Sequence, residues 1–146
     1  MKDQKLCTNV IAFFEGFEPN AKWDVNAWRL GFGSDTKGAD QTKVRKGDTT
    51  TLQEAKDNLQ ARLPEFEAIV LEEIGAEAWG KFAPNGQAAL MSFCYNYGEL
   101  TPTLESFAAQ ADVGNCALAI QEREVDNGGV NAKRRAAEAC LMASTE

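Results

Sequence analysis

Two carboxylic acids near the start of the chain have the types and spacing that cleavage of a glycosidic bond requires. Glu15 follows an apolar run, and Asp24 comes nine residues later, among aromatic and turn-forming residues. An acid shielded from water can stay protonated and protonate the leaving oxygen, while a hydrated acid stays ionised and activates water or stabilises positive charge. The alternative interpretation is an ordinary helix acid at Glu15 and an ordinary turn acid at Asp24. Glu18 and Asp35 are weaker candidates.

The composition narrows the classes of function that are open to this chain. Its 146 residues suit one domain with a buried core. The net charge is −7, from 15 basic and 22 acidic residues, and this excess of acid disfavours nucleic acid as a partner. The sequence contains no histidine, which excludes Ser-His and Cys-His hydrolase mechanisms and leaves no closely spaced metal ligands. We therefore expect neither a metal nor another cofactor.

Neither a membrane span nor a targeting segment is predicted. The longest apolar run, Val10–Phe14, is far shorter than the roughly 20 residues that a span needs, and it lacks the flanks of a signal peptide. We expect no membrane insertion, and synthesis in a cytoplasm. The cysteines are expected to be small buried residues in a reducing compartment, with disulfides as the alternative. They stand at positions 7, 94, 116 and 140.

The hydrophobic pattern predicts an α+β fold that begins with a helix and a small antiparallel sheet. The first helix, over residues 4 to about 17, has a stripe formed by Leu6, Val10, Phe13 and Phe17. On this helix Glu15 lies opposite the stripe and faces solvent. Residues 22 to 47 mix apolar residues with turn formers and predict about three strands, with a hairpin turn over Thr36–Asp40.

From Thr51 onward the pattern is helical. Thr51–Glu54 has the form of a capping box and begins a long helix over residues 52 to 74. The later helices are expected from a cap at Asn85 to Asn96, after Thr101-Pro102, from a cap at Asn115 to Glu124, and over residues 131 to 143. The last helix carries three cations, Lys133 to Arg135, at the end where the helix dipole disfavours them, so we expect an anionic partner elsewhere.

These elements predict one domain over residues 1–146 that is built from two lobes. The sheet lobe covers about residues 15–50. The helical lobe combines residues 1–14 with residues 51–146, and the long helix joins the two. A binding cleft is expected between the lobes.

Several stretches resemble, in the expected order, the phage-type lysozymes, also called endolysin muramidases. Phe14-Glu-Gly16, Trp23-Asp24 and Trp28-Arg-Leu-Gly-Phe-Gly33 are similar to the active-site region of this family, with the same spacing from Glu to Asp. Further similarity covers nearly the whole chain. It lies in Leu52–Arg62 for the helix between the lobes, Gln87–Gly98 for the central helix, Asn127–Gly129 for a closing loop and Lys133–Glu138 for the last helix.

The resemblance implies a lysozyme-like fold and an enzyme that cleaves the β-1,4 bond between N-acetylmuramic acid and N-acetylglucosamine in peptidoglycan. Glu15 would be the general acid and Asp24 the second carboxylate. One of the two arginines, Arg134 or Arg135, would approach Glu15 and fix its position. The residues implied to bind substrate or to support the acids are Arg29, Ser34 and Arg134.

The chain departs from the pattern of the family at two of these positions. Arg29 stands where the family has a threonine that helps to hold the attacking water, and Ser34 replaces a histidine. Three alternatives therefore stay open: a lytic transglycosylase, a non-catalytic glycan-binding module and a chitosanase-like glycosidase. The family also implies glycan strands as the partner, and a separate holin-type pore through which the enzyme passes from the host cytoplasm to the cell wall. We expect a monomer.

Overall fold

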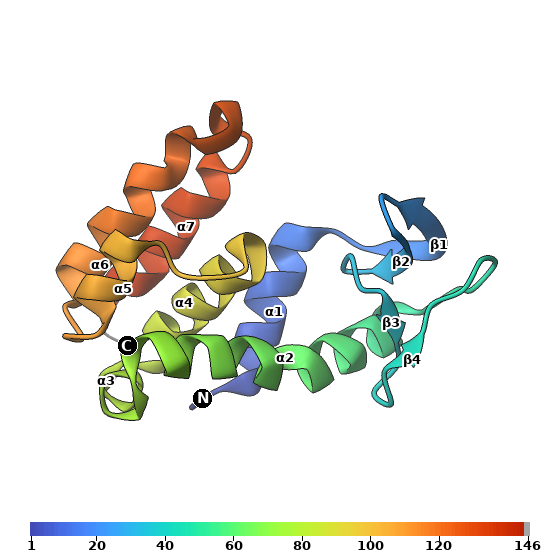
Figure 1. Ribbon diagram of the computed structural model, residues 1–146, viewed down its shortest axis with the longest axis horizontal. Coiled ribbons are helices and arrows are strands. Elements are labelled where there is room, and N and C mark those ends of the chain that lie inside the picture. Colours follow the sequence, from blue (N-terminus) through green and yellow to red (C-terminus); the bar gives the residue numbers. More distant parts are fainter. Residues whose placement is uncertain (145–146) are drawn as a thin grey trace. The chain divides into compact units, whose positions relative to one another are not determined.

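The computed structural model describes residues 1–144 and is mainly helical, with two short β-hairpins (Figure 1). The helices are α1 (Gln4–Glu15), α2 (Leu52–Ile74), α3 (Ala76–Lys81), α4 (Pro84–Tyr97), α5 (Pro102–Ala108), α6 (Val113–Gln121) and α7 (Ala132–Ala143), with a 3₁₀ segment η1 (Glu122–Gly129). The strands are β1 (Glu18–Asp24), β2 (Ala27–Gly31), β3 (Thr36–Lys37) and β4 (Thr42–Lys43). The α+β class predicted from the sequence is confirmed.

The chain divides into two compact units. The first, the sheet unit, is Thr8–Pro64, and the second, the helical unit, combines Met1–Cys7 with the chain from Glu65 onward. The divisions fall inside α1 and inside α2, so each of these helices contributes to both units. Proline lacks an N–H and interrupts the hydrogen-bond ladder of a helix. Pro64 lies inside α2 at the position where the chain passes from one unit to the other.

The buried face of α1 differs from the predicted face. Cys7 and Ile11 are buried, whereas Phe13 is 81% exposed, so the predicted stripe through Phe13 is wrong. Glu15 continues the spacing of four from Cys7 and Ile11, and four residues advance a helix by little more than one turn. Glu15 is accordingly half-buried rather than solvent-facing. The helix ends there because Gly16, with a φ of 68°, takes a left-handed conformation that favours glycine.

The sheet unit contains two antiparallel hairpins, where the sequence predicts one sheet of about three strands. In the first hairpin β1 pairs with β2, and Asp24 lies opposite Ala27. In the second β3 pairs with β4, and Thr36 lies opposite Lys43. A hairpin occurs where the sequence predicts one, but Thr36 and Lys37 belong to its first strand rather than to the turn, and Val44 follows the return strand. The first strand begins earlier than predicted, at Glu18, almost directly after the helix.

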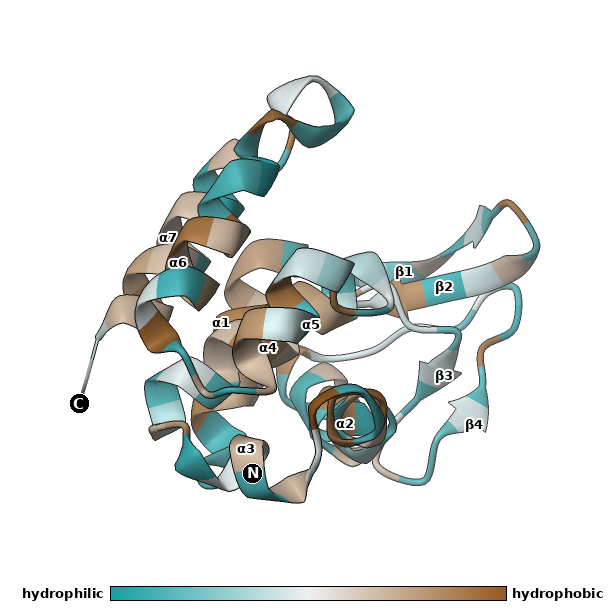
Figure 2. Ribbon diagram, turned by 60° about the vertical axis from the view of Figure 1, so that its left-hand side comes forward, coloured by the Kyte–Doolittle hydropathy of each residue, from teal (hydrophilic) through white to brown (hydrophobic). Residues whose placement is uncertain are grey.

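The turn between β1 and β2 is strained. It contains only Val25 and Asn26, and the Asn26 amide donates a hydrogen bond to the Asp24 carbonyl at 2.6 Å. Val25 has a φ of 53°, which β-branched residues rarely adopt. Its side chain is 90% exposed, so packing does not offset the strain, and a hydrophobic tip marks this turn in Figure 2.

The long helix α2 has the predicted bounds, Leu52–Ile74. Its first turn is capped as expected, because the Glu54 amide donates to the Thr51 hydroxyl oxygen at 3.1 Å. The reciprocal half of a capping box is replaced by another contact. The Thr50 hydroxyl lies 3.1 Å from the Glu54 carboxylate and donates to it.

Two of the predicted caps in the helical unit are wrong. Asn85 lies inside the first turn of α4, and its side chain donates to the Ser144 hydroxyl at 3.0 Å. The cap of α6 is Asp112, whose carboxylate accepts from the amide of Asn115. The predicted end of α4 is confirmed, because Gly98 has a φ of 85° and donates its N–H to a carbonyl in the preceding turn.

The core of the helical unit lies around α4, which is buried along most of its length. Helix α7 contacts both α4 and α6, and α6 runs beside α7 in both views (Figures 1 and 2). Apolar side chains fill the space between these helices. Those with little or no exposure include Leu90, Met91, Phe93, Ile120 and Met142. Within residues 1–144, no helix combines the length and the apolar character that crossing a membrane would need.

The four cysteines are free thiols. Cys7, Cys94 and Cys116 are buried, as the sequence predicts, and burial raises the pKa of each of these thiols to about 12. Such thiols are protonated and unreactive near neutral pH. Cys140 is exposed, which the sequence does not predict.

The strain at Val25 predicts that Val25→Asn stabilises the protein. A left-handed conformation costs an ordinary residue roughly 1–2 kcal/mol, and asparagine tolerates it better. We expect the free energy of unfolding, measured by urea titration, to rise by about 1 kcal/mol. The matched control is Val125→Asn, because Val125 is also exposed but is not left-handed. A loss of stability in Val25→Asn, or an equal gain in the control, would contradict this account.

Candidate functional site

The two candidate acids lie at the ends of consecutive elements of the sheet unit. Glu15 is the last residue of α1 and is half-buried, whereas Asp24 ends β1 with its side chain 64% exposed. An anionic side chain at the end of α1 faces the negative end of the helix dipole, so helix stability does not explain a glutamate there. The two carboxyl groups have unlike surroundings, which is the condition for dividing acid and base roles between them.

Glu18, a weaker candidate from the sequence, is unsuited to donate a proton. Its carboxylate lies 2.7 Å from the Lys22 ammonium; the Lys22 side chain is 70% exposed and that of Glu18 37%. The hydrogen bond from Lys22 holds the pKa of the Glu18 carboxyl below its usual value. A general acid needs its proton at working pH, so this environment is the wrong one for that role.

Arg29 is brought beside Asp24 by the first hairpin. Its Nε lies 3.7 Å from Asp24 Oδ2, and its Nη1 donates to the Gly33 carbonyl at 3.3 Å. Exposed ion pairs of this kind add little stability. The contact instead holds the guanidinium between the candidate carboxylate and the glycine turn that follows β2. Of the predicted site residues, Asp24 and Arg29 are therefore neighbours.

Ser34 is placed as a supporting residue rather than an exposed one. It is 3% exposed and exchanges two backbone hydrogen bonds with Leu30, each 3.0 Å long, across the turn after β2. Its hydroxyl accepts from the Thr36 amide at 3.1 Å and lies 3.1 Å from the Thr36 hydroxyl. The Asn58 amide on α2 donates to Thr36 and to the Gly38 carbonyl, both at 3.0 Å. This chain of polar contacts fixes the glycine turn to the helix.

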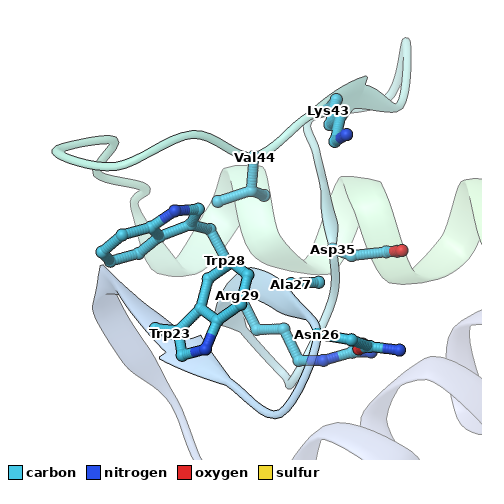
Figure 3. Close-up of a pocket in the computed structure, with 8 residues that line it drawn as sticks. All are labelled: Trp23, Asn26, Ala27, Trp28, Arg29, Asp35, Lys43 and Val44. Atoms are coloured by element: carbon cyan, nitrogen blue, oxygen red, sulfur yellow. The ribbon is translucent and has the colours of Figure 1, made fainter.

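A cavity of about 360 Å³ lies within the sheet unit and shares Arg29 with the ion pair. We call it the indole pocket, because Trp23 and Trp28 line it with their ring centroids 5.7 Å apart in an edge contact (Figure 3). Its remaining lining residues are Asn26, Ala27, Asp35, Lys43 and Val44. The sequence motif includes both tryptophans, but sequence reasoning did not predict a pocket. The signal in the sequence that could have indicated a pocket is a pair of tryptophans placed to meet across a short turn.

Arg134 is buried in the helical unit, where it contacts Ser92 on α4 and Glu138 on its own helix. Its Nε lies 3.1 Å from Glu138 Oε1, and its Nη2 donates to the Ser92 carbonyl at 3.0 Å. Glu138 Oε1 also accepts from the Ser92 hydroxyl at 2.6 Å. We call these residues, together with Arg135, the buried charge cluster.

Arg135 is fully buried and completes the buried charge cluster. Its Nη2 donates to Glu138 Oε1 at 2.8 Å, and its guanidinium carbon lies 4.6 Å from the ring centroid of Phe93 and 5.1 Å from that of Tyr97. Among residues 1–144, its Nε and Nη1 have no hydrogen-bond partner, so the aromatic faces supply part of the missing solvation. Burial raises the pKa of the Glu138 carboxyl, against the effect of the two guanidinium groups.

The buried charge cluster explains why two arginines occur near the start of α7. The sequence predicts an anionic partner elsewhere, but Arg134 and Arg135 pair with Glu138, four and three residues further along the same helix. Sequence reasoning missed Ser92 and Glu138, although the helical spacing of Glu138 from the arginines was a visible signal. The approach of Arg134 or Arg135 to Glu15 stays a prediction. No group of three or more acidic or cysteine side chains suited to hold a metal ion occurs among residues 1–144.

Comparison with known proteins assigns this chain to a family. The sequence model described as phage lysozyme matches residues 12–138. Among solved structures, the endolysin from Escherichia coli O157:H7 phage FAHEc1 is 25% identical, with a TM-score of 0.75 over 97% of this chain and 93% of that chain. No curated protein matches the sequence significantly.

Two further solved structures share the fold at lower identity. A mutant of P22 lysozyme is 19% identical, with a TM-score of 0.80 over 96% of this chain and 97% of that chain. The muramidase domain of SpmX from Asticaccaulis excentricus is 22% identical, with a TM-score of 0.74 over 96% of each chain. At these identities the similarity shows the fold alone. The lysozyme-like fold predicted from the sequence is confirmed.

The buried charge cluster predicts that Glu138→Gln strongly destabilises the protein. The substitution leaves two buried guanidinium groups without an anion, and breaking a buried ion pair costs about 3–5 kcal/mol. We expect a loss of about 3 kcal/mol in the free energy of unfolding, measured by urea titration. Glu122→Gln, at an exposed position, is the control and should change it by less than about 0.5 kcal/mol. Equal stability of the two variants would refute the role given to Glu138.

Proposed function

The chain belongs to the phage lysozyme family, a family of peptidoglycan hydrolases, and on this basis we propose that it is a muramidase. The bond cleaved is the β-1,4 linkage between N-acetylmuramic acid and N-acetylglucosamine. Glu15 is the general acid and Asp24 the second carboxylate. The observation that carries this assignment is the contrast between a half-buried Glu15 at a helix end and an exposed Asp24 at a strand end.

The proposed reaction divides the work between these two acids. The Glu15 carboxyl gives its proton to the glycosidic oxygen as the bond from that oxygen to C1 of the muramyl ring breaks. Positive charge then develops on the ring, and the Asp24 carboxylate stabilises it or activates the water that adds to C1. That water keeps one hydrogen as the new hydroxyl and releases the other as a proton, which leaves a reducing end.

Arg29 has a positioning role in this proposal. Its contact with Asp24 Oδ2 holds that carboxylate at the end of β1, and its bond to the Gly33 carbonyl anchors the guanidinium. The guanidinium is a permanent cation, so it gives the Asp24 carboxylate a fixed charge partner. Ser34 supports the same turn through its hydrogen bonds to Leu30 and Thr36.

The biological setting follows from the family. The family acts on the bacterial cell wall, and we propose that this enzyme is made in the host cytoplasm and reaches the wall at lysis through a separate holin-type pore. Its partner is then the glycan strand of peptidoglycan, and it acts as a monomer that contributes to host cell lysis. A preparation of the protein should clear purified peptidoglycan without any second protein.

One observation favours a second candidate reaction. Arg29 occupies the position where the family has a water-holding threonine, and its guanidinium lies beside Asp24. If no water is held there, the hydroxyl on C6 of the muramyl ring can attack C1 instead, which gives a 1,6-anhydro end and no reducing end. This is the lytic transglycosylase outcome, with the same proton donor.

Removing the proton of Glu15 tests the assignment of the general acid. Glu15→Gln keeps the size and the hydrogen-bonding capacity of the side chain but cannot donate a proton to the leaving oxygen. We expect the rate of turbidity loss of purified peptidoglycan to fall by at least about 100-fold. Glu18→Gln, three residues away at an acid that is paired with Lys22, should keep the rate of the wild type. Wild-type activity in Glu15→Gln would refute the assignment.

Product analysis separates the two reactions. We expect mass spectrometry of the released muropeptides to show reducing muramyl ends, each heavier by one water than the anhydro product. Arg29→Thr restores the family residue and should leave these products unchanged, because water remains the nucleophile. Anhydro ends from the wild type that become reducing ends in Arg29→Thr would show that Arg29 directs transglycosylation.

A further inference from the structure

The indole pocket has the size and composition of a ligand site. Its volume of about 360 Å³ lies within the range of roughly 300–1,000 Å³ that is usual for small-molecule sites. It is lined entirely by residues of the sheet unit, from β1, β2, β4 and the segment before β3 (Figure 3). Its geometry is therefore defined inside one compact unit.

Two aromatic rings in this pocket are left in contact with water. Trp23 is 59% exposed and meets Trp28 edge to face, so a large part of its ring is not used for packing. Large exposed aromatic side chains mark binding surfaces, and an indole face suits the C–H face of a pyranose ring. The strained Val25 lies between these tryptophans in sequence, and such strain gathers at ligand sites.

More of the charged residues that line the pocket are basic than acidic, whereas the protein as a whole is acidic. The chain has a net charge of −7, but the residues that line the pocket include two cations, Lys43 and Arg29, of which Arg29 also pairs with Asp24, and one carboxylate, Asp35. The amide of Asn26 can both donate and accept, which suits an acetamido group. A ligand with an apolar ring face, an acetamido group and a carboxylate would satisfy all of these groups.

We propose that the indole pocket binds a carboxylate-bearing N-acetylated sugar, of the type found in muramyl units. Its ring stacks on the indoles, and its carboxylate pairs with Lys43. The inference deepens the proposed function, on which it rests, by naming residues that select muramyl glycans over glycans that lack the carboxylate. A polycationic glycan such as chitosan would be disfavoured, because Lys43 and Arg29 repel it.

The test uses a matched pair of disaccharides that differ only in the lactyl ether at O3, which carries the carboxylate. The first is N-acetylglucosaminyl-β-1,4-N-acetylmuramic acid, and the second is N,N′-diacetylchitobiose. Binding is followed by tryptophan fluorescence, because two of the three tryptophans line the pocket, and Trp79, the third, is 5% exposed in the helical unit. We expect the emission to change with both sugars, and the muramyl sugar to bind about tenfold more tightly, the effect of one charge-assisted contact.

Three variants then assign the effect to the pocket. Lys43→Gln should remove the preference for the muramyl sugar and leave the affinity for chitobiose unchanged. Trp23→Ala, at an exposed position, should weaken both sugars at least tenfold. The matched control is Phe13→Ala, because Phe13 is an 81% exposed aromatic of the same unit that does not line the pocket, and it should change neither affinity. Circular dichroism establishes that each variant is folded.

Equal affinity for the two disaccharides, or unchanged affinity in folded Trp23→Ala, would overturn the proposal. The muramyl disaccharide contains no bond of the type that a muramidase cleaves, so its titration does not depend on turnover. Failure of the Glu15 assignment would therefore leave the binding result intact. Conversely, a wild-type protein that binds neither disaccharide but clears peptidoglycan normally would refute the pocket and leave the muramidase assignment standing.

Discussion

The pairing register of the first hairpin is the constraint on which the candidate site depends. With Trp23 opposite Trp28 and Asp24 opposite Ala27, the guanidinium of Arg29 reaches Asp24, and the two indoles meet. A slip of one residue would send each side chain of one strand to the other face and separate these groups. The register is set by a turn of only two residues, and the cost is the left-handed conformation of Val25.

The two units hold their polar groups by different physical means. In the sheet unit, neutral hydrogen bonds tie Ser34, Thr36 and Asn58 together, and each carries a modest net stabilisation. In the helical unit, a charged cluster is buried, and one carboxylate oxygen of Glu138 accepts from three donors. Its stability depends on every partner being present, because a single loss leaves a buried charge. The helical unit is therefore less tolerant of polar substitutions than the sheet unit.

Sequence reasoning could predict what depends on local spacing. Both ends of α2 follow from a capping residue at Thr51 and a sustained apolar period, and the end of α4 follows from the glycine at position 98. The buried face of α1 could not be predicted, because Phe13 suggests one apolar face and Ile11 another, and only tertiary packing decides between them. The same limit hides the pairing of Arg135 with Glu138, whose spacing is visible but whose burial is not.

For the candidate site, the residue types can be predicted from the sequence, whereas their neighbours in space come from the structure. The spacing from Glu15 to Asp24 and the family resemblance predict both acids from the sequence, and their catalytic roles stay a prediction. The indole pocket required the tertiary structure, since its lining comes from three separated segments: the first hairpin, Asp35, and Lys43 with Val44. Arg29 shows the difference most clearly: the sequence marks it as a departure from the family, and the structure shows that its Nε lies 3.7 Å from Asp24 Oδ2.

The net charge of −7 is compatible with an anionic cell-wall partner when local and long-range electrostatics are separated. Repulsion between exposed charges is largely screened beyond about 8 Å at physiological salt. Contacts inside the indole pocket act over much shorter distances, and there two cations face one carboxylate. Electrostatic complementarity of this kind governs which ligand is accepted more than how strongly the whole surface attracts it. A protein with an acidic surface can therefore select among glycans through cations in one pocket, without binding every anionic polymer.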